Sequence, residues 1–257
     1  MSNYTNVIAI VQARVGSSRL NAKILKTLYD KALLEHIVER IKASRRINTI
    51  VIATTLAGAD DIVCELSKKM GVAFFRGSDE NVLDRFYNAA KKYHADVIVR
   101  CTADRPFKDP EIIDQAIGFL LDGQYDYCSN TIEPTYPEGL DIEVFTMSTL
   151  EKAYHEARLS SEKEHVTPYI WKNPQLFKLY NFKNDVDLSA LRWTIDYESD
   201  YTFAKEIYKR LYPTKRLFLM NDILNVLAKE PEIGKINSSI IRNEGYLKSI
   251  EQEELDA

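Results

Sequence analysis

Residues Val7–Leu28 read VIAIVQARVGSSRLNAKILKTL. The apolar run at the start of this stretch predicts a buried first strand. The Gly- and Ser-containing turn after it carries Arg14, Arg19, Lys23 and Lys26, although the whole chain has a formal charge of −4. Open α/β sheets bind ligands at the carboxyl ends of their strands. Backbone N–H groups and fixed cations at that position favour an anion site, most plausibly for phosphates, over a solvated basic loop.

Around this stretch, the first 130 residues alternate short β-rich runs with amphipathic helical stretches. Strands are expected at Val7–Val11, Thr49–Thr54, Val72–Phe75, Asp96–Thr102 and Tyr125–Ser129. Helices are expected at Ala32–Lys42, Asp60–Lys69, Asn81–Tyr93 and from Asp109 onward. This βαβα order predicts an α/β fold with a mostly parallel central sheet flanked by helices.

From about residue 131 the pattern loosens, with Pro134, Pro137 and Gly139 marking an irregular segment. Further strands are expected at Leu140–Phe145 and Leu191–Ile195, and further helices at Ser148–Ala157, Glu164–Lys172 and Asp200–Leu211. Because no long linker interrupts the chain, residues 1–257 are expected to form a single domain. Its core would span about 1–130 and 181–212, with a lid-like insertion at about 131–180. A helical, charged C-terminal tail at about 213–257 shows no sign of chemistry.

The bulk composition bounds the class of protein. The 257 residues are 45% hydrophobic and 28% charged, as is ordinary for a globular protein, and the net negative charge argues against a nucleic-acid binder. Cys64, Cys101 and Cys128 have no CxxC spacing, which favours buried free thiols in a reducing cytosol. No membrane span and no secretory signal are predicted, so a cytoplasmic location is the default expectation.

Two familiar phosphate motifs are absent from the sequence. GxxxxGK[ST] does not occur, which disfavours a P-loop kinase or ATPase. GxGxxG does not occur either, which disfavours a dinucleotide-binding enzyme.

The pattern Q-A-R-x-G-S-S-R-L-x-x-K, from Gln12 to Lys23, occurs instead. Arg14 and Arg19 can fork onto phosphate oxygens, and Lys23 adds a point charge. Gly16 lets the backbone approach a ligand, and Ser17 offers a hydroxyl donor. Such a group could neutralise a triphosphate, although Arg19 could instead form a surface ion pair.

Two aspartates follow separate apolar runs. Asp104 lies in RCTADRP after the fourth predicted strand, and Asp196 lies in WTIDYESD. Carboxylates that arrive from separate strands suit Mg²⁺, which leaves room for phosphate oxygens and water. Either aspartate alone could equally be a helix cap or turn residue, and Asp200 is expected to be such a cap. Because both aspartates occur together with the cationic loop, a metal site is favoured over these structural roles.

Two further polar groups have weaker signals. The turn Arg76-Gly77-Ser78 could contact a nucleobase, or it could be a plain strand–helix connection. In the irregular half, polar side chains suit a hydroxyl-rich acceptor. A lone histidine such as His165 is more often structural than a ligand contact or base.

These segments resemble a known family: IVQARVGSSRLNAKIL, FRGSDENVLDR, VRCTADRPFKDPEIID, YDYCSNT, YPEGLDIEVF, EHVTPYI and LRWTIDYESDY. From residue 7 to about 201, the chain is similar to the cytidylyltransferase family of the spore coat polysaccharide biosynthesis type. That family is related to 3-deoxy-manno-octulosonate and acylneuraminate cytidylyltransferases. One departure is Asn21-Ala22, where the family often has Pro-Gly, and it puts the rigidity of the loop in doubt.

The resemblance implies a Rossmann-like nucleotidyltransferase (GT-A-like) fold that uses CTP and Mg²⁺. The catalytic residues it implies are Arg14, Arg19, Lys23, Asp104 and Asp196, the last two also as metal ligands. The implied nucleotide-binding residues are Gln12, Ala13, Arg14, Gly16, Ser17, Arg19, Lys23, Arg76, Gly77, Ser78, Thr102 and Asp104. The implied acceptor-binding residues are Asn130, Tyr136, Glu138, Asp141, Glu143 and His165, which would place the insertion on the acceptor side. Relatives of this kind are commonly homodimers.

The predicted reaction is attack of an acceptor oxygen on the α-phosphate of CTP, with release of pyrophosphate, in the biosynthesis of a capsule, another surface polysaccharide or a glycan. A phosphate acceptor is already anionic at neutral pH, and the sequence shows no convincing dedicated base, so a phosphorylated acceptor is favoured over a plain hydroxyl. The alternatives are a nucleotidyltransferase that uses GTP or another nucleotide, and a non-catalytic nucleotide-binding protein on the same fold.

Overall fold

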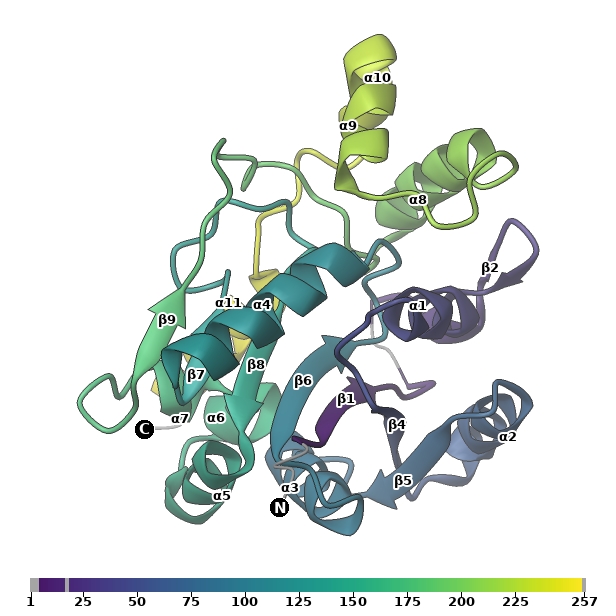
Figure 1. Cartoon of the computed structure of the whole chain (residues 1–257). Coiled ribbons are helices and arrows are strands. Elements are labelled where there is room, and N and C mark those ends of the chain that lie inside the picture. The colour runs from purple at the N-terminus through teal and green to yellow at the C-terminus, as the bar shows by residue number, and fades with distance from the viewer. Residues whose placement is uncertain (1–4, 17–18, 256–257) are drawn as a thin grey trace.

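A computed structural model describes residues 5–16 and 19–255, and its centre is a seven-stranded sheet (Figure 1). The strand order is β5 (Ala73–Gly77), β4 (Thr49–Thr55), β1 (Val7–Gln12), β6 (Val97–Thr102), β8 (Glu143–Thr146), β7 (Tyr127–Ser129) and β9 (Leu179–Asn181). Strands β5, β4, β1 and β6 are parallel, and β9 is parallel to β7. Only β8 runs against its neighbours. The predicted mostly parallel α/β fold is confirmed.

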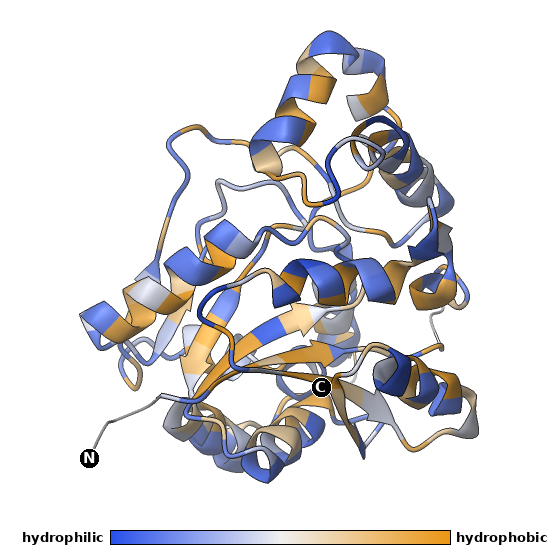
Figure 2. Cartoon of the chain, turned by 45° about the vertical axis from the view of Figure 1, so that its right-hand side comes forward, coloured by the Kyte–Doolittle hydropathy of each residue, from blue (hydrophilic) through white to orange (hydrophobic). Residues whose placement is uncertain are grey.

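Helices cover both faces of this sheet. One face packs against α1 (Leu33–Lys42), α2 (Asp61–Lys69), α4 (Pro110–Gly123) and α8 (Glu198–Leu211). The other packs against α3 (Val82–Lys92), α5 (Met147–Glu156) and α7 (Pro168–Trp171), and α6 (Ser160–His165) packs on α3. Alternate residues of β1 belong to the two opposite cores, which explains why this strand is apolar without interruption. Figure 2 shows the orange strands enclosed by helices with one blue and one orange side.

The remaining elements are short or lie near the chain's end. They are the 3-10 helices η1 (Lys23–Leu25) and η2 (Gly58–Asp60), the hairpin β2 (Thr27–Leu28) and β3 (Lys31–Ala32), and the helices α9 (Met220–Lys229), α10 (Pro231–Gly234) and α11 (Glu244–Leu255). Helices α9 and α10 pack on α8, whereas α11 returns to pack on α6. Among the described residues, no helix has both the length and the apolar character needed to cross a membrane.

Two predicted elements are wrong. Leu191–Ile195 is not a strand: it is an extended segment with one isolated bridge, between Glu138 and Arg192. Arg192 to Ile195 are all buried, so the apolar residues here reflect burial of an extended segment without sheet pairing. The helix expected at Glu164–Lys172 is divided into α6 and α7, because Val166 takes a positive φ of 72° and Pro168 begins the next helix. The short strand β9 was not predicted.

Candidate active site

A cavity of about 1310 Å³ opens at the carboxyl ends of β1 and β6. The cationic loop after β1 and the loop after β6 form one side of it, and α6, α7 and α11 form another. The two strand ends are neighbours, because Gln12 pairs with Thr102 in the sheet register. The cavity therefore lies where the sequence predicts a ligand site in an open parallel sheet.

The predicted cation–carboxylate cluster is formed in the structure. The Lys23 ammonium lies 3.2 Å from Asp104 Oδ2 and 2.8 Å from Asp196 Oδ1. Arg19 Nη2 lies 2.7 Å from the same oxygen of Asp196. Asp104 and Asp196 are 92 positions apart in sequence, yet both carboxylates contact the Lys23 ammonium at the wall of the cavity.

Main-chain hydrogen bonds hold these two aspartates in place. The Asp104 carbonyl oxygen accepts from Ile195 N at 2.8 Å, so the two loops are joined beside the cluster. The fully buried Asp200 carboxylate accepts from the amides of Asp196 (2.9 Å) and Tyr197 (3.0 Å), which caps the start of α8 from its first turn. Arg192 in turn donates to Asp200 through Nε at 2.9 Å. The orientation of Asp196 thus depends on a buried network that its own local sequence does not reveal.

The electrostatics of the cluster favour its charged form. Burial by itself raises the pKa of Asp104, but Lys23, Arg105 and the Thr102 hydroxyl together lower it well below its ordinary value. Burial lowers the pKa of Lys23, but Asp104 and Asp196 more than reverse that effect and raise it. Asp104 and Lys23 are therefore both charged at neutral pH.

The donor set of Asp104 and Asp196 fits a magnesium ion. Their oxygens converge on one position, now facing the Lys23 ammonium, and Mg²⁺ typically takes one or two carboxylates and completes its shell with phosphate oxygens and water. In residues 5–16 and 19–255, no group of three or more Asp, Glu, His or Cys side chains could hold a metal by itself. A metal here would therefore take its remaining ligands from phosphate oxygens and water.

The cationic loop presents further charges to the cavity. Gln12, Ala13, Arg14, Gly16, Arg19, Lys23 and Thr102 all line it, whereas Ser17 lies outside the described residues. Arg14 pairs at 2.6 Å with Asp79, and both side chains are half exposed, so this pair can open at little cost. Ala22, in the segment that departs from the family pattern, takes a left-handed φ of 48°, which glycine adopts more easily.

Arg85 was not among the predicted site residues, although it lies in the segment FRGSDENVLDR. Its side chain is buried and lines the cavity, Nη1 donates to the Ser78 carbonyl oxygen, and Nε has no hydrogen-bond partner in the described part of the chain. Burial, with nearby Arg14 acting in the same direction, lowers its pKa to about 10, so the guanidinium is still charged at pH 7. No carboxylate of the described residues forms a salt bridge with Arg85, and a buried cation of this kind is suited to an incoming anion or carbonyl.

Five predicted residues do not line this cavity: Arg76, Gly77, Ser78, Asn130 and Tyr136. Arg76 turns toward η2 and donates to the carbonyl oxygens of Thr55 and Ala57, at 2.8 Å each. Asn130 is fully buried, and its amide is used by the main chain of Leu140 and Ile142. The side chains of Arg76 and Asn130 hold loops in place. The residue type alone does not tell whether a polar side chain holds a loop or binds a ligand.

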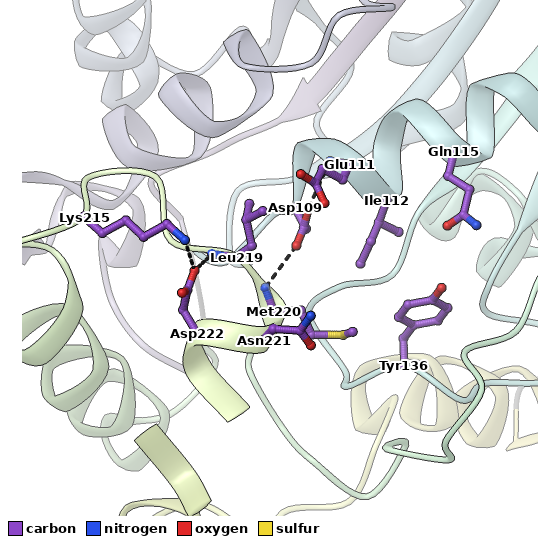
Figure 3. Close-up of a pocket in the computed structure, with 10 residues that line it drawn as sticks. All are labelled: Asp109, Glu111, Ile112, Gln115, Tyr136, Lys215, Leu219, Met220, Asn221 and Asp222. Carbon is purple, nitrogen blue, oxygen red and sulfur yellow. Dashed lines mark hydrogen bonds and ion pairs between the residues drawn. The ribbon is translucent and has the colours of Figure 1, made fainter. Parts of the chain in front are cut away.

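Tyr136 lines a second, smaller cavity of about 500 Å³, between the start of α4 and the start of α9 (Figure 3). There Asp109 accepts from Met220 N at 3.0 Å and from Glu111 N at 3.0 Å, so its carboxylate is fully used in capping. Figure 3 shows these side chains between α4 and α9, and none of the charged residues predicted for the active site lies among them.

Three predicted acids that line the large cavity are held in ion pairs, two of them by arginines that also pair with Asp104 or Asp196. Glu138 pairs with Arg192, Asp141 with Arg105 at 3.0 Å and with Arg242, and Glu143 with Arg100. All three acids are buried. Burial alone would raise the pKa values of Asp141 and Glu143, but the arginines beside them lower both pKa values. These acids line the cavity, yet much of their hydrogen-bonding capacity is already taken.

The fourth predicted acceptor residue that lines the cavity, His165, is also held in place. Its Nε2 lies 2.9 Å from Ser249 Oγ in α11. Burial lowers the pKa of His165 to about 4, with Arg100 acting in the same direction and Glu164, Glu143 and Glu253 opposing. The imidazole is therefore neutral at pH 7, and with so low a pKa it is a weak general base.

This shift predicts a pH dependence of stability. Between about pH 6.5 and 4 the unfolded chain binds a proton at His165 that the native chain does not, so stability is full above pH 6.5 and is lost as the pH falls. In urea unfolding, we expect the step from pH 7 to pH 5 to cost the wild type about 2 kcal/mol more than His165→Gln. The exposed His155→Gln is the control, and equal losses in wild type and His165→Gln would contradict the shift.

A cationic loop, two carboxylates and a nucleotide-sized cavity at the strand ends of a mostly parallel sheet define an α/β protein of the nucleotidyltransferase type. Residues 8–230 match the profile of the cytidylyltransferase family, and the chain belongs to that family. It is therefore an enzyme of the nucleotidyltransferase class, and the resemblance seen in the sequence is confirmed.

Three similar proteins support this assignment. The uncharacterised protein MJ1063 of Methanocaldococcus jannaschii is 41% identical over 93% of this chain and 97% of its own length. The spore coat polysaccharide biosynthesis protein SpsF of Bacillus subtilis is 35% identical over 80% of this chain and 87% of its own. The solved structure of a cytidylyltransferase from Leptospira borgpetersenii is 36% identical, with a TM-score of 0.87 over 93% of this chain and all of that one.

Proposed function

We propose that this enzyme transfers CMP from CTP to a small sugar, sugar phosphate or other phosphorylated acceptor and releases pyrophosphate. The observation that carries the proposal is the convergence of Arg19, Lys23, Asp104 and Asp196 at one wall of the cavity. Cations for a triphosphate and carboxylates for a metal meet there, which a protein that only binds nucleotides would not need.

The residues of the chain divide the work as follows. Lys23 and Arg19 would move from the aspartates to the triphosphate, where they neutralise charge that builds up on the leaving pyrophosphate. Asp104 and Asp196 would hold Mg²⁺, which supplies Lewis-acid neutralisation at the phosphates. Arg85 and Arg14 would hold the rest of the nucleotide. Because His165 is a weak base, a phosphorylated acceptor, which needs little proton removal, is favoured.

Pyrophosphate release tests this function directly. The purified enzyme with Mg²⁺ is given CTP, GTP, ATP or UTP together with 3-deoxy-manno-octulosonate, N-acetylneuraminate, sugar 1-phosphates or polyol phosphates. We expect release that requires both CTP and one acceptor class. Thermal shifts with the four nucleotides rank their binding, since ligands of the native state raise its stability. A larger shift with GTP would overturn the choice of CTP, and no release from any pair would count against the transfer reaction.

Removing the Lys23 ammonium should weaken nucleotide binding. Lys23→Met keeps the aliphatic stem and removes a charged donor, so we expect about thirtyfold weaker CTP binding by calorimetry, equal to about 2 kcal/mol. Lys26→Met is the matched control, because Lys26 pairs with Glu198 at 2.8 Å and does not line the cavity. Equal CTP affinity in wild type and Lys23→Met would reject the role of Lys23.

Four broader features complete the proposal. The product is used in making a surface polysaccharide, such as a capsule, or another glycan. The enzyme acts as a homodimer, and light scattering measures its mass in solution. The chain acts in the cytoplasm, since its three cysteines are free and buried. Residues 131–180 serve as the acceptor-side insertion of the single domain.

A further inference from the structure

The C-terminal segment, residues 237–255, lies beyond the stretch that matches the family profile and returns to the cavity. Asn237 is buried and donates to the Arg192 carbonyl oxygen at 3.0 Å and to Asp200 Oδ1 at 2.8 Å. Further along, the Asn243 amide donates to Glu138 Oε1 at 3.0 Å. The segment is therefore anchored to the network that holds Asp196 before α11 begins. The sequence gives no sign of chemistry in this tail, because its return to the cavity depends on tertiary contacts.

Helix α11 lies on the cavity as a wall and buries none of its own residues fully. It is held by polar contacts to α6: Ser249 Oγ lies 2.9 Å from His165 Nε2, and Glu253 Oε2 accepts from Ser161 Oγ at 2.9 Å. Its residues that line the cavity are Glu244, Gly245, Tyr246, Lys248, Ser249, Gln252 and Glu253. A helix that contributes so little to the core, yet so much to a cavity, is placed for binding.

Tyr246 is the aromatic residue of this wall. Its ring lies edge-on to His165, at 5.2 Å between centroids, and to Trp171, at 5.8 Å. Its hydroxyl is buried and has no hydrogen-bond partner among the residues that the structure describes. A buried hydroxyl without a partner costs free energy, and a polar ligand group that arrives beside it removes that cost.

We propose that the C-terminal segment forms one wall of the acceptor's binding site and that Tyr246 is a specificity-determining residue for a polyhydroxylated acceptor. The rings of Trp171 and Tyr246 line the cavity, where aromatic rings suit the C–H groups of such a molecule, and Tyr246 also offers a hydroxyl for one of its polar groups. The cation–carboxylate cluster borders the start of this wall, where a Cβ on Gly245 would lie 3.2 Å from Arg19 Nη1, so the acceptor would meet the nucleotide beside the cluster. This inference rests on the proposed transfer function.

The hydrogen bond from Tyr246 is the feature that discriminates between acceptors. A site built to bond a substrate hydroxyl loses far more with the analogue that lacks it than an apolar pocket does. Tyr246→Phe removes the hydroxyl and keeps the ring, so the change in acceptor preference isolates that single group. Tyr246→Ala removes the ring as well and tests the aromatic contact.

The test measures binding and turnover separately. N-acetylneuraminate, 3-deoxy-manno-octulosonate and ribitol 5-phosphate are titrated with CMP present, and Trp171 emission reports occupancy. Trp171→Phe shows the residual signal of Trp193, which is buried in the core. Pyrophosphate release with CTP then gives KM and kcat. Tyr29→Phe and Tyr29→Ala are controls, since Tyr29 is exposed and does not line the cavity.

We expect at least one probe to change Trp171 emission and to bind about tenfold more weakly to Tyr246→Phe, with a matching rise in the acceptor KM, little change in kcat and CTP affinity within twofold. Tyr246→Ala should lose more. A wild type that releases pyrophosphate, with unchanged acceptor KM in both Tyr246 variants, overturns this inference alone. Emission that no probe changes also overturns it. A wild type that binds no nucleotide instead refutes the proposed function.

Discussion

Asp104→Asn and Asp196→Asn are each expected to lower kcat about a thousandfold, which corresponds to about 4 kcal/mol of transition-state stabilisation. The neutral amide keeps the shape of each side chain but removes the negative charge that a divalent cation needs. Both carboxylates lie within 3.2 Å of Lys23, so either substitution also leaves the ammonium with one acidic partner in place of two. Pyrophosphate release at saturating CTP and acceptor measures the effect.

These two changes should cost folding much less than they cost turnover. Asp104 and Asp196 are partly exposed at the cavity, and we expect each melting temperature to fall by no more than about 4 °C. Asp61→Asn is the matched control, because Asp61 pairs with Arg76 on the exposed side of α2. Turnover at the wild-type level in both site variants would refute their metal role. A thousandfold loss in the control as well would show a general effect of charge.

Gly139→Ala is expected to destabilise the protein by about 4 kcal/mol and to lower its melting temperature by about 10 °C. Gly139 has a φ of +111°, and an added Cβ would lie 2.5 Å from the Trp193 carbonyl oxygen. That oxygen belongs to the backbone, so it cannot rotate away as a side chain would. The segment from Glu138 to Asp141 must then shift away from Trp193.

The same shift should reduce turnover, because Glu138 and Asp141 are bonded to the arginines and the C-terminal segment around the cavity. Thermal unfolding and pyrophosphate release are both measured. Gly58→Ala is the control, since a Cβ there meets nothing within 4 Å and Gly58 does not have a positive φ. A Gly139→Ala variant as stable as wild type would show that the two backbone segments are not held together.

Features that depend on local sequence were predicted correctly more often than features that depend on contacts between distant residues. The strand-then-turn pattern of Val7–Lys23 and the run ending at Asp104 are local, and both led to the correct strand ends and to the cation–carboxylate cluster. Arg76, Asn130 and Tyr136 were predicted at the site from residue type and family position, but their partners are carbonyls, amides and a second cavity. Polarity alone does not tell which way a side chain turns.

Local periodicity, strand-end position and the pattern from Gln12 to Lys23 were sufficient to predict the parallel part of the sheet, the edge at which the cavity lies and an anion site there, because a strand places its own following loop at a fixed edge. The cytidylyltransferase family came from the resemblance of whole segments. Only the tertiary structure decided that Arg85 is buried beside the site and that Ser249 reaches His165, 84 positions away. Contacts across such distances depend on how helices pack, and they leave no spacing in the sequence that could be read.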